Sequence, residues 1–582
     1  MADPVLVATT LSQSQIRLTW TLPVNPDEFH VEQSPSGTGD WVDIVTVDGA
    51  IRTGYVSSLD CGTPYYFRVR AKTGGSYGNY SNIDDATTLA CIYAQGPVGV
   101  FEIMWASPAY TVETARVIGS IGYDYGIMSA GASITELGMG PVARLTVVLD
   151  NHDGRYSVTK SASQAYVNGL YQHPMRFTAG YGGSTGVIFM GRVQDIIYDE
   201  KAATATLTCH GYDYDLVQQR PETLALEDQR TDELIASLAT GMTFANQTLE
   251  RAYCVVPWHY TDSDDGMQEI RELAECEGGI AWVNPMTGYL EYWAWAHWLG
   301  VASAATVTPA NAENAKPRYS FADARDVVNV TYTSRRLGRL ATVHQLTRPV
   351  VIAPLSTTKQ RMRFRSPLGR LQAYYTRART SGGTNMDAAL TVGTTSPASA
   401  TGWETTLQNT DDELAIVVDR WDVVGWPLQG LPNREYRNEA ASSPALEVSR
   451  RHDFYPGQEI GPYQMRSRYS MQTEVQAKLV GDLRHTRLSG PPLFVEIGPV
   501  PGDIALNVGS VVTLTLTSNT TAINTDFVLV HRRGSYGGRW EETWQAVMRD
   551  DLYDYVTWQV PSGNAGYLKI GTSQLNAGRL GY

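Results

Sequence analysis

The chain has 582 residues, of which 43% are hydrophobic and 18% are charged, and its formal net charge is −14 at pH 7. These values are typical of a globular protein, and the length predicts about three to five domains. Abundant glycine, proline and tyrosine favour β-structure with many turns, whereas the acidic balance excludes a general affinity for nucleic acid, which needs clustered lysine and arginine.

The first ninety residues predict a β-sandwich. In QIRLTWTLP, the residues Ile16, Leu18 and Trp20 share one strand face, and LDCGTPYYFRVRAK places Tyr65 just before the alternating apolar positions that start at Phe67. This segment resembles a fibronectin type III domain, with Tyr65 in its tyrosine-corner strand and Trp20 at the core tryptophan. The resemblance implies a spacer or a surface module rather than a catalyst.

Gly140–Leu216 predicts one antiparallel β-meander that curls into a small barrel. Apolar residues alternate from Leu145 to Leu149 before a turn at Asn151–Gly154, and two later strands turn around Asp199–Lys201. None of these residues is arranged for chemistry, so the pattern favours a structural role.

A small mixed α/β unit follows. TDELIASLAT has helical spacing with Thr231 or Asp232 as the expected N-cap, and a second helix is expected from about 263 to 277, where Gly278 stops it. GIAWVNPMTGYLEYWAW then predicts a hairpin that turns through Asn284–Gly288.

Strands resume near Asp326, and a Thr/Gly/Ser-rich stretch near 380–402 predicts an insertion. A long strand ends at Gly430, and a helix is expected over 471–487. The expected apolar face of this helix consists of Val475, Leu479 and Leu483. Four more strands follow, and the last residues are too polar to form a core of their own.

Four segments after residue 90 resemble the tail hub proteins of long-tailed bacteriophages, also called minor tail or baseplate hub proteins. They are LTVVLDNHDGRYS, FMGRVQDIIYDEKAATATLTCHGYDYDL, ELAECEGGIAWVNPMTGYLEYW, and VVGWPLQG with the later helix and PGDIALNVGSVVTLTLTSNT. The resemblance implies a mainly β chain, with two hub β-barrels, a small α/β domain and an inserted β-rich domain behind the fibronectin III β-sandwich.

The expected ranges are 1–90 for the fibronectin-like domain, 91–225 for the first hub barrel, 226–312 for the α/β domain, 313–368 and 470–555 for the two parts of the second barrel, 369–469 for the inserted domain and 556–582 for a C-terminal tail. The resemblance further implies a homotrimer whose six barrels form a ring that continues the tail tube. Ring closure would also cover strand edges that are otherwise open to uncontrolled pairing.

Such a protein would be made in the host cytoplasm and reside in the virion, at the tail tip. Its implied partners are distal tail or tube proteins, the tape measure and tail fibres, with DNA only in transit through the lumen. An acidic lumen would keep the passing polyanion from sticking. We expect no secretory signal, because the N-terminus MADPVLVATT has no basic-then-apolar pattern, and no membrane segment, because no apolar run reaches the required length.

Two acidic clusters are candidate calcium sites, because hard cations prefer carboxylate oxygens. One contains Asp262, Asp264 and Asp265, and the other is DNHDG at Asp150–Gly154. Neither has EF-hand spacing. The first is better explained by N-terminal helix charges and the second by a turn, so we expect no metal.

Zinc ligation and catalysis also lack a local pattern. Cys209–His210, and Cys254 with His259, do not have finger or ribbon spacing, and no GxSxG, HExxH or Walker motif is present. The cysteines are expected to be buried reduced thiols: Cys61, Cys91, Cys209, Cys254 and Cys276. We therefore expect no enzymatic activity and no cofactor.

The aromatic run YLEYWAWAHWLG contains Tyr292, Trp293, Trp295 and Trp298. On a strand, Trp293 and Trp295 would share a face and could stack on sugar rings. Buried instead, each aromatic would contribute about 2–3 kcal/mol to a core or to a subunit contact, which is the favoured interpretation. The alternatives to a hub are a carbohydrate-binding or carbohydrate-degrading protein with a fibronectin-like spacer, and a receptor-binding tail adhesin.

Overall fold

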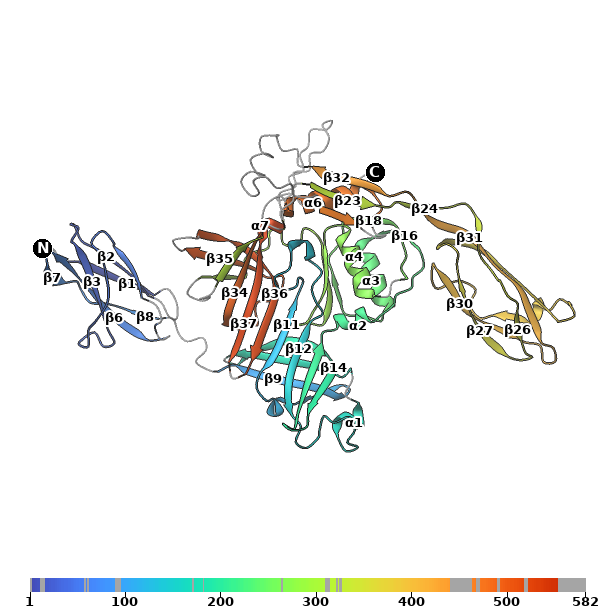
Figure 1. Ribbon diagram of the computed structural model, residues 1–582, viewed down its shortest axis with the longest axis horizontal. Coiled ribbons are helices and arrows are strands. Elements are labelled where there is room, and N and C mark those ends of the chain that lie inside the picture. Colours follow the sequence, from blue (N-terminus) through green and yellow to red (C-terminus); the bar gives the residue numbers. More distant parts are fainter. Residues whose placement is uncertain are drawn as a thin grey trace.

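The structure, a computed structural model, is mainly β, as the sequence predicts (Figure 1). It describes residues 3–10, 16–56, 59, 62–88, 96–169, 172–181, 183–262, 265–308, 315–320, 323, 327–439, 463–466, 471–488, 492–517, 522–537 and 539–552. The expected C-terminal tail therefore lies outside the described residues. Among those residues, no helix is both long and apolar enough to cross a membrane.

The N-terminal unit packs two sheets face to face. One has the order β1-β2-β5, and the other has the order β4-β3-β6-β7 with β8 also paired to β6. The bounds are β1 Val5–Thr10, β2 Ile16–Thr21, β3 Glu28–Ser34, β4 Val42–Asp48, β5 Thr53–Val56, β6 Pro64–Thr73, β7 Ser76–Tyr80 and β8 Asp84–Thr87. Trp20 lies in the core with its ring 5.7 Å from that of Phe29, and Tyr65 is buried in the same core.

A thirteen-stranded sheet, here called the large sheet, forms the centre of the molecule (Figure 1). Its main path has the order β10-β9-β13-β14-β15-β12-β11-β36-β37-β34-β22, while β35 pairs with β36 and β21 with β35. The bounds are β9 Val98–Ala106, β10 Ala109–Val112, β11 Ile121–Gly126, β12 Arg144–Asp150, β13 Pro174–Tyr181, β14 Ser184–Asp199, β15 Thr204–His210, β21 Ala305–Val307, β22 Ala315–Tyr319, β34 Leu493–Pro501, β35 Val511–Thr517, β36 Ala522–Tyr536 and β37 Trp540–Met548.

The expected meander is wrong in its strand order. β12 pairs with β15, with Leu145 opposite Cys209 and Leu149 opposite Ala205, and not with the next strand of the chain. The reason is the connection: a long segment that contains the short helix α1 (Gln164–Asn168) separates β12 from β13, so no hairpin turn forces these two strands together. The predicted alternation itself is confirmed, because Leu145 and Leu149 are fully buried.

Two helices and a hairpin form where the sequence predicts them after residue 226, with one correction at a helix cap. Arg230, not Thr231 or Asp232, is the N-cap of the first helix, and its backbone N–H donates to Glu233 at 3.0 Å. Asp265 caps the second helix by accepting from the Gln268 backbone N–H at 2.9 Å. The bounds are β16 Leu226–Arg230, α3 Thr231–Gly241, β17 Gln247–Leu249, β18 Val255–His259, α4 Gly266–Glu275, β19 Ile280–Asn284 and β20 Tyr289–Trp293.

The last long helix buries two of the three residues predicted for its apolar face, Leu479 and Leu483. The third, Val475, is wrong, because it is 65% exposed. Ala477 and Val480 are buried in its place, since two residues turn a helix by about 200° and so move Val475 to the opposite side from Ala477. This helix, α6, packs on a three-stranded sheet of order β32-β23-β33. The bounds are β23 Val327–Tyr332, β32 Arg434–Glu439, β33 Tyr463–Arg466, α6 Glu474–Leu488 and α7 Arg549–Leu552.

A further β-rich unit projects from the rest of the chain, opposite the N-terminal sandwich (Figure 1). Here β31 pairs with β24, β25, β26 and β28, and a second sheet has the order β27-β30-β29. The bounds are β24 Arg335–Leu337, β25 Ala341–Gln345, β26 Val350–Ile352, β27 Thr357–Arg363, β28 Leu368–Arg379, β29 Leu390–Val392, β30 Gly402–Asn409 and β31 Ile416–Gly430. Trp403 and Trp421 meet in its core with ring centroids 5.6 Å apart.

Candidate functional site: the seam and edges of the large sheet

The large sheet is assembled from two halves that lie far apart in the sequence. β11 pairs antiparallel with β36, from Ile121 opposite Tyr536 to Gly126 opposite His531. One hydrophobic cluster crosses this seam, because it contains Leu145 and Phe177 from the first half and Trp540 from the second. The halves therefore form one continuous body.

A buried polar network joins the two halves of the large sheet at the seam. The Arg532 guanidinium donates to Glu542 at 2.6 Å, and each of these residues is only 1% exposed. The Tyr123 hydroxyl donates to the same carboxylate, Trp540 Nε1 donates to the Tyr123 oxygen at 2.7 Å, and Trp544 Nε1 donates to Glu542 at 2.8 Å. Burial and the Glu542 charge raise the pKa of Tyr123 well above its ordinary value, so its hydroxyl stays a donor.

Local sequence reasoning missed this network, although one signal exists. In RWEETWQAV the positions of Trp540, Glu542 and Trp544 share a strand face, so a carboxylate stands between two tryptophans at an inward position. A buried carboxylate requires a partner. The sequence cannot name that partner, because Arg532 comes from another strand.

The two ends of the main path are short strands with exposed side chains. Val112 on β10 is 60% exposed and Tyr319 on β22 is 55% exposed. Within the part of the chain that the structure describes, no strand pairs with the outer side of either strand. Open edges of this kind are templates for pairing with another chain.

A groove of about 1030 Å³ runs over the seam on the polar face of the large sheet. It is lined by both signs of charge: Arg144, Lys316, Arg318 and Arg533, together with Asp124, Glu496, Glu541 and the buried Glu542. His531 bridges the two halves here, with its Nε2 atom 2.6 Å from Asp124. The groove can thus interact with polar or charged surfaces.

The four aromatic residues singled out in the sequence lie inside the chain rather than on a platform. Tyr292, Trp293 and Trp298 are buried, and only Trp295 is half-buried. The expected strand face shared by Trp293 and Trp295 is wrong, because β20 ends at Trp293 and the chain then turns. Trp298 Nε1 donates to the Gly509 carbonyl at 2.8 Å, so this hairpin packs against the second half of the large sheet.

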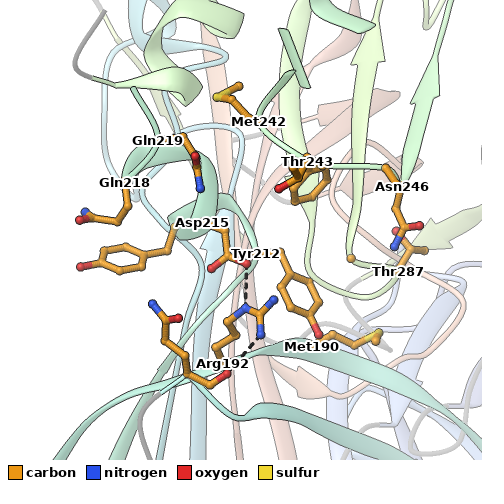
Figure 2. Close-up of a pocket in the computed structure, with 15 residues that line it drawn as sticks. Met190, Arg192, Tyr212, Asp215, Gln218, Gln219, Met242, Thr243, Asn246 and Thr287 are labelled. Carbon is orange, nitrogen blue, oxygen red and sulfur yellow. Dashed lines mark hydrogen bonds and ion pairs between the residues drawn. The ribbon is translucent and has the colours of Figure 1, made fainter. Parts of the chain in front are cut away.

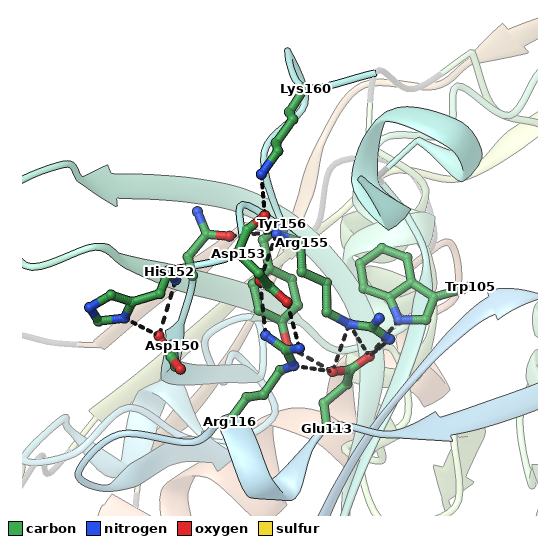
Figure 3. A network of polar contacts seen from close by, with 10 residues as sticks. Trp105, Glu113, Arg116, Asp150, His152, Asp153, Arg155, Tyr156 and Lys160 are labelled. Carbon is green, nitrogen blue, oxygen red and sulfur yellow. Dashed lines mark hydrogen bonds and ion pairs between the residues drawn. The ribbon is translucent and has the colours of Figure 1, made fainter. Parts of the chain in front are cut away.

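The DNHDG turn belongs to a network that includes a buried carboxylate (Figure 3). Glu113 accepts from Trp105 Nε1 at 2.7 Å, from Arg155 Nη2 at 2.6 Å and from the Tyr156 hydroxyl at 2.8 Å. Asp153, within the predicted turn, forms an ion pair with Arg116 at 2.7 Å. The network fixes the loop after β12, and no local pattern marks Glu113, because its partners come from other segments.

The candidate metal ligands do not gather. Among the described residues, no group of three or more histidine, cysteine, aspartate or glutamate side chains is placed to hold a metal ion. Cys209, Cys254 and Cys276 are buried and form no disulfide, and burial raises the pKa of the Cys209 thiol. Cys61, Cys91 and Asp264 lie outside the described residues.

Comparison with protein families gives one match. Residues 4–84 match the fibronectin type III domain. Together with the two-sheet sandwich and its buried Trp20, this match confirms the N-terminal fibronectin type III domain that the sequence predicts. No curated protein matches the chain in sequence.

The chain is structurally similar, at low sequence identity, to several prophage and bacterial tail proteins. A tail protein from Neisseria meningitidis MC58 is 9% identical, with a TM-score of 0.42 over 79% of this chain and 100% of that one. The 43 kDa tail protein of prophage MuSo2 from Shewanella oneidensis is 11% identical, with a TM-score of 0.41 over 79% and 100%. A prophage tail protein from Listeria monocytogenes EGD-e is 8% identical, with a TM-score of 0.36 over 77% and 94%.

Proposed function

We propose that the chain is a non-enzymatic structural protein of a bacteriophage tail tip, three copies of which close into a hub ring that continues the tail tube and lets DNA pass. One observation carries the proposal: the large sheet contains two halves joined at the seam, and its main path ends in two open edges. Three copies would bring six halves together, and pairing between copies would cover both ends of the main path. The four ordered sequence segments that resemble tail hub proteins support the same assembly.

The open edges, β10 and β22, are the surfaces at which we place the contact between copies. Both strands are short and carry exposed apolar side chains, Val112 and Tyr319. Ring closure would bury these side chains and satisfy the free backbone groups of both edges. The seam network would keep the two halves at a fixed angle, which a closed ring requires.

The same proposal assigns the remaining units. The strands of 335–430 pair with one another, and the expected division at residue 369 falls inside β28, so we place the inserted domain at 335–430. We propose that tube proteins, the tape measure and tail fibres contact the ring. The acidic lumen stays a prediction, and the mixed charges of the groove would allow only weak contact with DNA if that face lines the channel.

The sugar platform at the tryptophan hairpin is not proposed again, because Trp293 is buried against His297 and Trp298. An adhesin would need a receptor contact, and no observation favours one. The hub ring is therefore the function that the described surfaces support best.

The test is the mass and shape of the purified full chain. Native mass spectrometry should give three copies of a 64.0 kDa chain, about 192 kDa, and negative-stain images should show a hollow ring. Val112→Lys on the β10 edge should shift the mass toward one copy, because charge on an edge strand opposes pairing. Val5→Lys is the matched control, since Val5 is 57% exposed on β1, an edge strand of the fibronectin domain.

The proposal is overturned by a particle in which single copies hang outside the tail with no channel through them. A trimer that tolerates Val112→Lys as well as Val5→Lys would instead refute only the placement of the contact at β10.

A further inference from the structure

A cleft of about 590 Å³ lies where five segments meet beside the large sheet (Figure 2). Its walls come from Gln172 just before β13, from β14, from α2 (Asp213–Val217) and the residues on either side of it, from the loop that follows α3, and from the β19–β20 turn. A volume of this order suits one small molecule rather than an extended chain. None of its side chains belongs to the seam or to the open edges.

The charges in this cleft cancel. Arg192 Nε donates to Asp215 Oδ2 at 2.7 Å, and Arg192 Nη1 donates to the Gln172 carbonyl at 3.2 Å. The other lining residues are uncharged. A phosphate, a carboxylate or an amine would therefore enter without a counter-charge, whereas a neutral ligand would meet one guanidinium and one carboxylate already held in place.

The polar groups that remain can both donate and accept. The side-chain amides of Gln219 and Asn246 and the hydroxyl of Thr243 line the cleft from its two sides (Figure 2). Within the described part of the chain, these three side chains have no hydrogen-bond partner. An amide offers donors and an acceptor within one planar group, which matches a ligand whose hydroxyls also do both.

The apolar part of the wall is firm. Gly288 lies so close to Tyr212 that a Cβ atom there would sit 3.0 Å from the ring, and Met190 N–H donates to the Pro285 carbonyl at 2.7 Å. Met242 and Phe244 add apolar surface on the opposite side. Aromatic and methionine surfaces contact C–H groups favourably, and a wall fixed in advance lowers the entropic cost of binding.

We infer that this cleft binds a neutral sugar residue. Hydroxyls would pair with the amides and with the free atoms of the Arg192–Asp215 pair, while the C–H face of the ring would lie on the apolar wall. The inference does not depend on ring assembly, because every lining residue belongs to a single chain.

The test uses the full chain and three neutral probes: glucose, galactose and N-acetylglucosamine. Saturation-transfer NMR should detect at least one of them, with a millimolar dissociation constant from titration. Gln219→Leu combined with Asn246→Leu should weaken binding at least about ten-fold, because two hydrogen-bonding groups are lost. Gln408→Leu, at an exposed glutamine on the distant strand β30, is the matched control and should leave the affinity unchanged.

The inference is overturned if none of the three sugars gives a saturation-transfer signal. It is equally overturned if the double variant binds as well as Gln408→Leu does, or if glucose 6-phosphate or glucosamine binds more tightly than glucose. Should the double variant melt earlier than the control, Thr243→Val keeps the side-chain size, removes one hydroxyl from the cleft and must weaken binding. A negative sugar result beside an intact ring would refute this inference alone.

Discussion

The strongest consequence of the seam network is that replacing one carboxylate oxygen of Glu542 by an amide nitrogen should weaken the junction between the two halves of the large sheet. In Glu542→Gln the side chain keeps its shape but loses its charge. Arg532 would then remain fully buried beside an amide, and the Trp544 Nε1–H group and the Tyr123 hydroxyl would lose their charged acceptor. The perturbation is thus electrostatic and leaves the packing volume intact.

The size of the effect follows from burial. Removing one partner of a buried pair costs about 3–5 kcal/mol, because the other charge stays in a poorly solvated site. Glu541, the neighbouring residue on β37, has a half-exposed side chain whose contact with Arg539 spans 4.0 Å, so Glu541→Gln should cost less than about 1 kcal/mol. The first loss is a large share of the stability of a typical domain, about 5–15 kcal/mol.

Urea unfolding monitored by tryptophan fluorescence measures both variants. Trp540 and Trp544 take part in the network itself, so their emission reports the unfolding of the large sheet. The midpoint of Glu542→Gln should fall well below that of Glu541→Gln, with an unchanged slope. If the two variants unfold within about 1 kcal/mol of each other, the network does not hold the seam.

Three further predictions concern other buried groups. Glu113→Ala should cost about 1–3 kcal/mol in urea unfolding and open the loop after β12 to proteases, because the buried Trp105 and Tyr156 donors lose their acceptor and the partly buried Arg155 loses its ion-pair partner. Burial raises the pKa of Glu269 to about 7, so above the ordinary glutamate pKa the folded chain holds a proton that the unfolded chain has lost. The contribution of Glu269 to stability therefore falls as the pH rises toward 7. Relative to the natural chain, the free energy of unfolding of Glu269→Gln should increase by about 2–3 kcal/mol as the pH is raised from 5 to 8. Gly509→Ala should lower the unfolding midpoint, because φ is +91° and a Cβ atom would lie 2.5 Å from the Trp293 ring.

Each of these predictions has a control. Glu136→Ala changes an exposed glutamate and should leave the free energy of unfolding unchanged. Equal losses of stability for Glu136→Ala and Glu113→Ala would show that Glu113 does not anchor the loop after β12. Burial lowers the pKa of His259, which lies 3.8 Å from Glu269, to about 3. The contribution of His259 to stability therefore rises with pH, whereas that of Glu269 falls. The quantity to measure is thus the difference in free energy of unfolding between the Glu269→Gln variant and the natural chain at each pH. Gly119→Ala has a similar φ of +82° in open space, and a loss as large as that of Gly509→Ala would exclude the clash.

Much of the fold follows from local patterns. Alternation predicts the strands, including β31 with its end at Gly430, and the spacing of apolar residues with Gly278 predicts the helix that becomes α4. The fibronectin domain is also predicted from local signals, because Trp20 and Tyr65 stand at fixed positions within a short stretch. Such signals work because a strand or helix repeats every two or 3.6 residues wherever one face is buried.

The candidate site is different, because most of its contacts join distant residues. The seam pairs β11 with a strand more than 400 residues later, and the partners of Glu542 are drawn from Tyr123 and Arg532. Trp293 and Trp295 show that a local pattern can also predict an arrangement that the folded chain does not adopt. Their spacing predicts one face of a strand, but β20 ends at Trp293, whose ring lies against Gly509 from a distant part of the chain.

By itself, then, the sequence determined the fibronectin domain, the mainly β class and most strand and helix positions, since these depend on the nearest few residues. Strand order, the buried networks and the two open edges were decided only by the tertiary structure. The physical reason is that backbone pairing is nearly independent of side-chain identity, so a strand carries little information about its neighbour. A buried charge shows that a partner exists, and only the folded chain shows which residue supplies it.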